Sequence, residues 1–317
     1  MVYNGSFELY DTCPNNLTQP GANQIYALGW YIPTFATSDY YHTCDVTATV
    51  GVPQNQLGYQ DAHTGSAYAG IYYISGRGQT TGQVYFNYSE YLQTRLTATL
   101  AAGILYHIQL FVSRADSING ASIPRFAGSA VDQIGVLFSQ NPVLGPDSLF
   151  DRLLPYTPSA ESAEGVLLTD TTRWQEVNMY YVAQGNENYL TVGFFRDINS
   201  VSASYYFHDF DTTDVICSYY YLDDISIMEA TQIEVPNVFT PNGDGTNDLF
   251  VIQAPKGLHP GITIYNRWGT VTYRNGDGPV AWDGTFSGNR CTDGTYYYVL
   301  EVKGTPIKQK GFIRLAR

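Results

Sequence analysis

Apolar and polar residues alternate with a period of two through much of residues 1–229, and helical periodicity is almost absent there. The apolar faces of the expected strands are Leu92, Leu96, Ala98 and Leu100; Ile104, Tyr106, Ile108, Leu110 and Val112; Ile134, Val136 and Phe138; and Leu190, Val192 and Phe194. A last strand is expected over residues 216–228, where Tyr219, Tyr221, Ile225 and Ile227 are prominent. Many such strands with turn residues between them predict an antiparallel β-sandwich.

Residues 141–172 break this pattern. They contain four Pro and few alternating runs, so we expect a long loop of the kind that often carries function.

Residues 235–248 have a different character, Val-Pro-Asn-Val-Phe-Thr-Pro-Asn-Gly-Asp-Gly-Thr-Asn-Asp. Two Pro fix φ, and two Asx-Gly pairs follow, so we expect a short strand that runs into a tight turn. Asn242, Asp244 and Asp248 also alternate in the manner of calcium-loop ligands. Because Asn-Gly and Asp-Gly form such turns without a metal, we favour a turn.

Four further blocks follow in order: Ile-Thr-Ile-Tyr-Asn-Arg-Trp-Gly (262–269), Trp-Asp-Gly (282–284), Asp-Gly-Thr-Tyr-Tyr-Tyr-Val-Leu (293–300) and Gly-Phe-Ile-Arg-Leu-Ala-Arg (311–317). Together with residues 235–248 they closely resemble the gliding-motility-associated C-terminal domain of Bacteroidetes, the type B sorting signal of the type IX secretion system. The resemblance implies a small Ig-like β-sandwich over 230–317, passage through the type IX translocon, and an outer-membrane β-barrel partner. It therefore predicts two domains, 1–229 and 230–317, in a secreted or outer-membrane-attached protein.

Charge is distributed unevenly between these two regions. Residues 1–229 contain seven Arg, no Lys and 22 Asp or Glu, a net charge of −15, whereas residues 230–317 carry +2. So acidic a chain argues against nucleic acid or anionic lipid as a partner. No apolar run is long enough for a membrane span, so we expect no direct membrane insertion. Residues 1–8 already have the pattern of a folded strand, so we expect a signal peptide to have been removed before Met1.

Four cysteines, Cys13, Cys44, Cys217 and Cys291, allow three pairings into disulfides. We favour Cys13 with Cys44, because both lie in irregular sequence near the N-terminus. Cys217 and Cys291 then either link the two domains or remain thiols.

The ends of residues 1–229 resemble those of galactose-binding-like jelly rolls, including several carbohydrate-binding modules. The resemblance rests on Asn-Gly-Ser-Phe-Glu at 4–8, Gly-Trp at 29–30 and Tyr-Leu-Asp-Asp-Ile-Ser-Ile at 221–227. Such domains often hold a structural Ca²⁺ between the first and last strands. Carried over, the resemblance implies Glu8 and Asp224 as ligands, with Asp223 as a substitute, and two carboxylates with backbone carbonyls suit this ion. The alternative is that Glu8 binds backbone N–H groups and Asp223 is solvated.

Aromatic residues suggest a sugar-binding surface, because sugar rings stack on exposed aromatic faces. We expect Trp268 and Trp282 to pack in the C-terminal core and Trp30 and Trp174 to be structural. The candidate platforms are tyrosines in loop-like or edge sequence: Tyr40, Tyr41, Tyr72, Tyr73, Tyr85 and Tyr88. The alternative at each position is a Tyr pair in a strand with one ring pointing inward.

Motifs for a nucleophile elbow, a phosphate-binding loop and a zinc helix are absent from the sequence, so we expect no enzyme activity. The favoured function is a surface adhesin or glycan-binding module. The alternatives are a structural subunit of a filament, sheath or surface assembly, which predicts self-association, and a glycan-active enzyme, which predicts two convergent carboxylates. Among the five histidines, His63 is the one that we single out as a candidate catalytic residue. The alternative is that it forms a structural hydrogen bond to a neighbouring strand.

Overall fold

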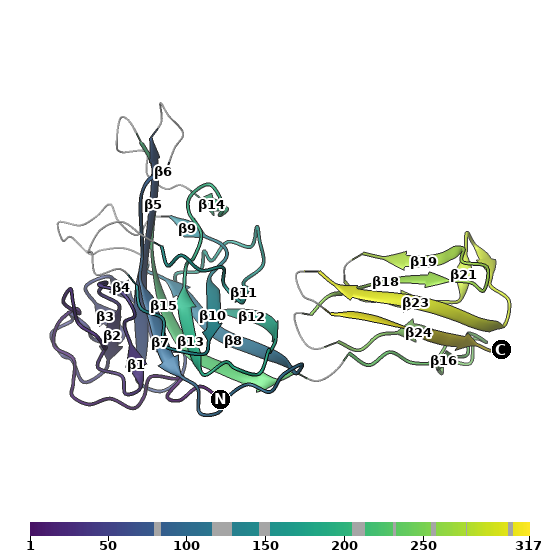
Figure 1. Ribbon diagram of the computed structural model, residues 1–317, viewed down its shortest axis with the longest axis horizontal. Coiled ribbons are helices and arrows are strands. Elements are labelled where there is room, and N and C mark those ends of the chain that lie inside the picture. The colour runs from purple at the N-terminus through teal and green to yellow at the C-terminus, as the bar shows by residue number, and fades with distance from the viewer. Residues whose placement is uncertain are drawn as a thin grey trace. The chain divides into compact units, whose positions relative to one another are not determined.

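The computed structural model describes residues 1–78, 84–115, 129–145, 153–204, 213–230, 233–254, 258–276, 278–303 and 307–317 (Figure 1). Of residues 77–78, 84–86 and 213–215 it describes the backbone only. Every regular element in these ranges is a strand, which confirms the all-β prediction. No helix in the described residues is long and apolar enough to span a membrane. The chain forms two compact units, unit 1 (Met1–Met228) and unit 2 (Glu229–Arg317). The boundary between them lies one residue before the expected boundary, which was after residue 229.

Unit 1 is a sandwich of two mainly antiparallel sheets. The first sheet has the order β1 (Trp30–Tyr31), β7 (Tyr91–Arg95), β13 (Tyr189–Gly193), β10 (Gly135–Ser139), β11 (Ala160–Glu161). The second has the order β12 (Gln175–Val182), β8 (Leu105–Arg114), β15 (Thr213–Glu229), β5 (Ala67–Gly78), β2 (Asp39–His42), and β6 (Val84–Ser89) also pairs with β5. Two short pairs complete the unit: β3 (Gln54–Asn55) with β4 (Gly58–Tyr59), and β9 (Ala130–Val131) with β14 (Ala203–Ser204).

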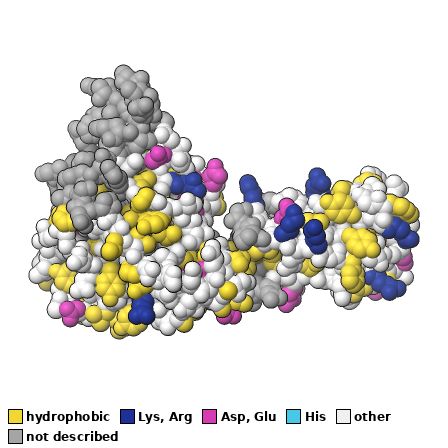
Figure 2. Space-filling view, viewed as in Figure 1, with side chains coloured by type: hydrophobic (Ala, Val, Ile, Leu, Met, Phe, Trp, Pro, Cys, Tyr) yellow, Lys and Arg dark blue, Asp and Glu magenta, His cyan; other side chains and the backbone are white. Residues whose placement is uncertain are grey.

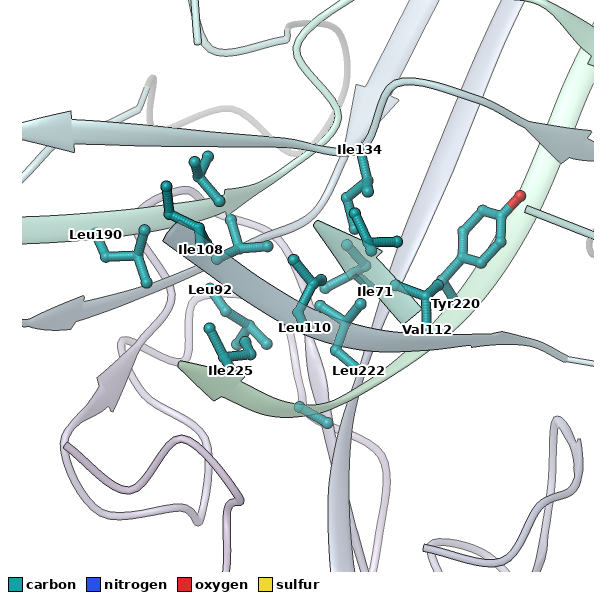
Figure 3. Close-up of a cluster of buried hydrophobic side chains, with 14 of the residues drawn as sticks. Ile71, Leu92, Ile108, Leu110, Val112, Ile134, Leu190, Tyr220, Leu222 and Ile225 are labelled. Carbon is teal, nitrogen blue, oxygen red and sulfur yellow. The ribbon is translucent and has the colours of Figure 1, made fainter. Parts of the chain in front are cut away.

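The main core lies between these sheets and is formed by the alternating apolar positions (Figure 3). Along β8, Tyr106, Ile108, Leu110 and Val112 are buried, as the alternation predicted. The predicted faces at 134–138 and 190–194 are buried as well. Ala98 and Ile104 are exposed instead, because β7 ends at Arg95 and β8 begins at Leu105.

The last strand of unit 1 changes its inward-facing positions at residues 223–224. Tyr220 and Leu222 face the main core, and so do Ile225 and Ile227. Asp224 has φ of +47°, a left-handed backbone conformation, and the alternation of the strand is interrupted at this point. Tyr219 and Tyr221 therefore lie on the other face and do not share a face with Ile225 and Ile227.

The first residues of the chain lie beside this last strand. The N-terminal ammonium of Met1 donates to the carbonyl of Ile227 (3.1 Å), and the N–H of Ile225 donates to Gly5 (2.8 Å). A Cβ on Gly5 would lie 2.0 Å from the carbonyl oxygen of Ile225, so this close approach needs glycine. Glu8 is thereby carried to the region of Asp223 and Asp224.

Residues 141–172 follow the expectation of a long connection only in part. Strand β11 lies within them, and the side chains of Val143, Leu154 and Leu168 are buried inside unit 1. Residues 146–152 lie outside the described ranges.

Unit 2 is built on a five-stranded sheet of the order β16 (Val238–Phe239), β24 (Lys308–Leu315), β23 (Gly294–Val302), β18 (Pro260–Tyr265), β19 (Val271–Asn275). Two short pairs accompany it: β17 (Phe250–Val251) with β20 (Ala281–Trp282), and β21 (Thr285–Phe286) with β22 (Asn289–Arg290). Trp282 is buried and contacts the rings of Phe239 and Tyr296, with centroids 5.2 Å away in each case. Unit 2 thus has an aromatic core of its own, in which Trp282 packs as predicted.

Candidate functional site

Glu8, Asp223 and Asp224 meet the same loop of unit 1, residues 63–67. Glu8 Oε1 accepts hydrogen bonds from the backbone N–H groups of Ser66 (2.8 Å) and Ala67 (3.0 Å). This is the alternative that the sequence left open, a carboxylate that binds backbone N–H groups.

Asp223 and Asp224 hold the other side of this loop. Asp223 Oδ2 accepts from the N–H of His63 (3.0 Å) and of Thr64 (3.3 Å), and Oδ1 accepts from the N–H of Asp224 (2.7 Å). Asp224 Oδ2 lies 2.6 Å from His63 Nδ1, and its Oδ1 accepts from the Thr64 hydroxyl (2.9 Å). The ring of His63 stacks on Phe111 at 3.6 Å. His63 therefore has partners on its ring face and at Nδ1, and Asp223 is buried, not solvated.

The contacts above use much of the acceptor capacity of these carboxylates. Ca²⁺ takes roughly six to eight oxygen ligands, and Glu8 Oε1 and the oxygens of Asp223 and Asp224 already contact N–H groups, a hydroxyl or an imidazole. The described residues contain no group of three or more His, Cys, Asp or Glu placed to hold a metal. Burial raises the pKa of Asp223 to about 8, and the charge of Asp224 adds to the rise. A group that holds its proton to such a pH is a poor ligand at neutral pH. Calcium remains a prediction that a chelation experiment can test.

The tyrosines predicted to bind sugar lie mostly inside unit 1. Tyr40, Tyr41 and Tyr73 are buried, so an exposed platform is wrong for these three. Tyr72 and Tyr88 are half-buried. Tyr85 belongs to β6, but its side chain lies outside the described residues.

The physical reason is that β2 and β5 are covered on both faces. Tyr40 and Tyr73 point into the main core. On the opposite face, Tyr41 packs in a second buried cluster with Val50 and Leu57, which come from the irregular segment 43–66. Neither ring of the Tyr40–Tyr41 pair therefore reaches solvent.

Two buried carboxylates, those of Glu90 and Asp39, accept hydrogen bonds from tyrosines in this part of unit 1. Glu90 accepts from the N–H of Tyr72 (2.8 Å) and the hydroxyl of Tyr88 (2.7 Å). Asp39 accepts from the hydroxyl of Tyr219 (2.8 Å), which also lies 2.7 Å from the Tyr41 hydroxyl. Burial raises the pKa of both acids. The pattern is that of a satisfied internal network, which suits a structural role.

Several exposed aromatic side chains of unit 1 lie instead on its N-terminal segment, while Tyr59 and Tyr156 are exposed elsewhere in the unit. We define the N-terminal patch as Tyr3, Leu9, Tyr10, Leu28 and Tyr31, each at least 37% exposed. The Asn4 side chain joins its parts by donating to the carbonyls of Leu9 (2.7 Å) and Leu28 (3.0 Å). The ring of Tyr3 lies over Gly29. These residues were not predicted from the sequence, although Tyr3, Tyr10 and Tyr31 stand in irregular, turn-rich segments.

One disulfide joins Cys13 to Cys44, as predicted, with a Cα–Cα distance of 6.0 Å. Cys217 is buried in β15 and Cys291 is half-buried in unit 2. Neither forms a disulfide in the described part of the chain.

The predicted turn in unit 2 is confirmed, and its Asx side chains hold it. Asn242 Oδ1 accepts from the N–H of Asp244 (3.0 Å), and Asp248 accepts from the N–H of Gly243 (2.7 Å) and Gly245 (2.8 Å). These backbone hydrogen bonds lower the pKa of Asp248. The Asp248 carboxylate therefore binds the backbone of its own loop, as expected for a turn that forms without a metal.

Arg317 closes the opposite side of this turn, a role that sequence reasoning missed. Its guanidinium donates to the carbonyls of Pro241 (3.1 Å) and Cys291 (2.8 Å) and pairs with Asp293 (2.9 Å). The side chain thus ties the end of β24 to the turn after β16 and to the start of β23.

Trp268 contradicts the prediction that it packs in the core of unit 2, because 75% of it is exposed. It sits at the tip of the turn between β18 and β19, beyond the sheet. Lys and Arg side chains are frequent on the face of unit 2 drawn in Figure 2.

Comparison with known proteins identifies one part of the chain. Residues 233–315 match the model of the CHU_C type IX secretion signal domain. No curated protein matches the chain. Two solved structures are similar at low level. One is a Stig cyclase, Fisc, from Fischerella sp. TAU in complex with (3Z)-3-(1-methyl-2-pyrrolidinylidene)-3H-indole, with 10% identity, 72% of this chain and 94% of that chain covered, and a TM-score of 0.37. The other is a CBM4 structure, with 11% identity, 72% of this chain and 99% of that chain covered, and a TM-score of 0.28.

The secretion signal domain coincides with unit 2, so this protein is exported to the cell surface or the medium and interacts with the type IX secretion machinery. The two structural similarities are too weak to bear on the function of unit 1.

Proposed function

We propose that this protein is a non-catalytic surface adhesin, in which unit 2 directs export and unit 1 contacts glycans. The observation that carries the proposal is the match of residues 233–315 to a secretion signal domain that folds as a unit with its own core. An outer-membrane β-barrel is the proposed partner of unit 2. Strand β24 offers it an edge, because β16 pairs only with Arg314 and Leu315 of that strand.

The adhesive surface of unit 1 is the N-terminal patch. Tyr3, Tyr10 and Tyr31 give it aromatic faces with hydroxyl groups at their edges, which suits contact with sugar rings.

Export is tested by fusing a reporter protein to residues 229–317 behind an inner-membrane signal in a type IX-competent bacterium. We expect the reporter in the medium or on the cell surface, and retention inside the cell when residues 229–317 are deleted from the full chain. A reporter that stays inside while the deleted chain still leaves would refute the assignment of unit 2.

Adhesion is tested separately with purified full chain on glycan-coated surfaces. Tyr3→Ser with Tyr31→Ser should reduce retention several-fold, as expected for loss of aromatic anchors. Val46→Ser is the matched control, because Val46 is 92% exposed and outside the patch. Equal retention of both variants would exclude the patch as the adhesive surface.

A structural subunit of a surface assembly is the second candidate, favoured by the same exposed apolar side chains. It predicts that light scattering of the full chain shows a mass that grows with concentration, and that Tyr3→Ser with Tyr31→Ser suppresses this growth. A monomer at every concentration supports the adhesin.

A further inference from the structure

Two turns of unit 2 flank a hollow of about 310 Å³. One turn joins β18 to β19 and carries Trp268, and the other joins β21 to β22 and follows Phe286, which is 45% exposed. Aromatic side chains therefore line the hollow from two separate places, Trp268 from a turn and Phe286 from the end of β21. Thr272 and Tyr296 line it as well.

The turn that carries Trp268 is held in place by its own hydrogen bonds. Asn266 Oδ1 accepts from the N–H groups of Trp268 (3.0 Å) and Thr270 (2.9 Å), and the backbone of Asn266 bonds to Thr270 and Gly269. The Arg267 guanidinium lies 5.2 Å from the centroid of the Trp268 ring. A large aromatic side chain is thus fixed at the surface, where folding gains little from its burial.

The lining of the hollow indicates the class of ligand. Its polar lining residues are Asn266, Thr272, Ser287, Asn289, Arg290, Cys291, Thr292 and Tyr296. Among the described residues, those that line it include no Asp or Glu. An aromatic face beside a few uncharged donors and acceptors and one cation fits a ligand with C–H faces and many oxygens.

We propose that this hollow is a saccharide-binding site, with a sugar ring stacked on the exposed side of Trp268 and its hydroxyl or carboxylate groups on Asn289 and Arg290. The site belongs to unit 2 and does not depend on the N-terminal patch of unit 1. A protein segment of the secretion machinery is the competing occupant, since Trp and Arg also dominate protein interfaces.

The test is equilibrium binding of the full chain to a defined panel: cello-, xylo- and chito-oligosaccharides and oligomers of glucuronic and galacturonic acid. We expect at least one probe to bind, and Trp268→Ala to weaken that binding roughly tenfold or more. Arg290→Ala should weaken it as well, by a smaller factor. Phe312→Ala, which removes an exposed ring of unit 2 outside the hollow, should leave it unchanged.

Thermal unfolding of each variant controls for folding, and the exposed position of Trp268 predicts an unchanged melting temperature. The Tyr3→Ser with Tyr31→Ser variant separates this site from the proposed adhesive patch, because it should keep the Trp268-dependent binding. Absence of binding by the unmodified chain, or equal binding by Trp268→Ala, overturns the proposal. Loss of export by Trp268→Ala without any saccharide binding assigns the hollow to the secretion machinery and also overturns it.

Discussion

Truncation of Glu8 should loosen the loop at 63–67 and destabilise unit 1. Its carboxylate accepts two backbone hydrogen bonds, and Ala67, one of the two donors, is fully buried. The loop lies tightly on the carboxylate: a Cβ on Gly65 would come within 2.3 Å of the carboxyl carbon, and Gly65 has φ of +66°. A buried N–H group that loses its acceptor costs about 1–3 kcal/mol. Since water can reach Ser66 in part, we expect Glu8→Ala to cost about 2–4 kcal/mol.

Glu8→Gln separates a hydrogen-bond acceptor from a metal ligand. The amide retains one oxygen that can accept both N–H groups and loses the charge and the second acceptor oxygen, which has no contact among those described above, so its cost should be about 1 kcal/mol. Urea unfolding of the full chain gives the free energies, and hydrogen exchange of the peptides that cover residues 63–67 assigns the loss to this loop. Both series are repeated with a chelator.

If Glu8 acts only on the loop, stability falls in the order wild type, Glu8→Gln, Glu8→Ala, and the chelator changes nothing. The reasoning is refuted if the chelator lowers the stability of the wild type to that of Glu8→Gln and leaves the variant unaffected. That result would establish the calcium ion predicted from the resemblance to jelly rolls.

Three further expectations follow from single side chains. Between its ordinary pKa of 3.8 and its raised pKa of about 8, Asp223 keeps its proton in the folded state but loses it in the unfolded chain. Stability should therefore fall as pH rises through this window, by at most about 1.4 kcal/mol per pH unit, and melting curves of Asp223→Asn should lose that slope. Tyr219→Phe leaves a buried oxygen of Asp39 without its donor and should cost about 2 kcal/mol in urea unfolding. Arg317→Ala should destabilise unit 2 by about 1–3 kcal/mol, visible as faster proteolysis of residues 229–317, and Arg317→Lys should not restore it, because one ammonium cannot reproduce contacts with both carbonyls and Asp293.

The strands of the sandwich were predictable because their alternation is a local property of the chain. Ile108 and Leu110 are buried where the period of two places them. The turn at Asn242 was predictable for the same reason, since Asx side chains bind backbone N–H groups two or three residues away.

The surface chemistry was not predictable in this way. Whether Tyr41 is exposed depends on segment 43–66, which lies over the sheet and contributes Leu57 to the cluster. Whether Trp268 is buried depends on how far its turn extends beyond the sheet of unit 2. The left-handed backbone at Asp224 likewise accompanies a change in which later side chains face the core, and the period of two in the sequence does not predict it.

Many of the acids of residues 1–229 are not free surface charges, because they accept hydrogen bonds from the backbone. Asp132 accepts from the N–H of Gly165 (2.6 Å) and Ser202 (2.8 Å), and Glu187 accepts from three successive N–H groups at residues 184–186. Asp39, Glu90 and Asp223 also accept backbone N–H groups, but burial raises the pKa of each and disfavours its charged form. In a region with no Lys, acidic side chains thus hold irregular segments by hydrogen bonds to the backbone, which need no cationic side chain. The acidity of unit 1 is therefore in large part the means by which its long loops are held on the sandwich, and so says less about its partners than the charge alone suggests.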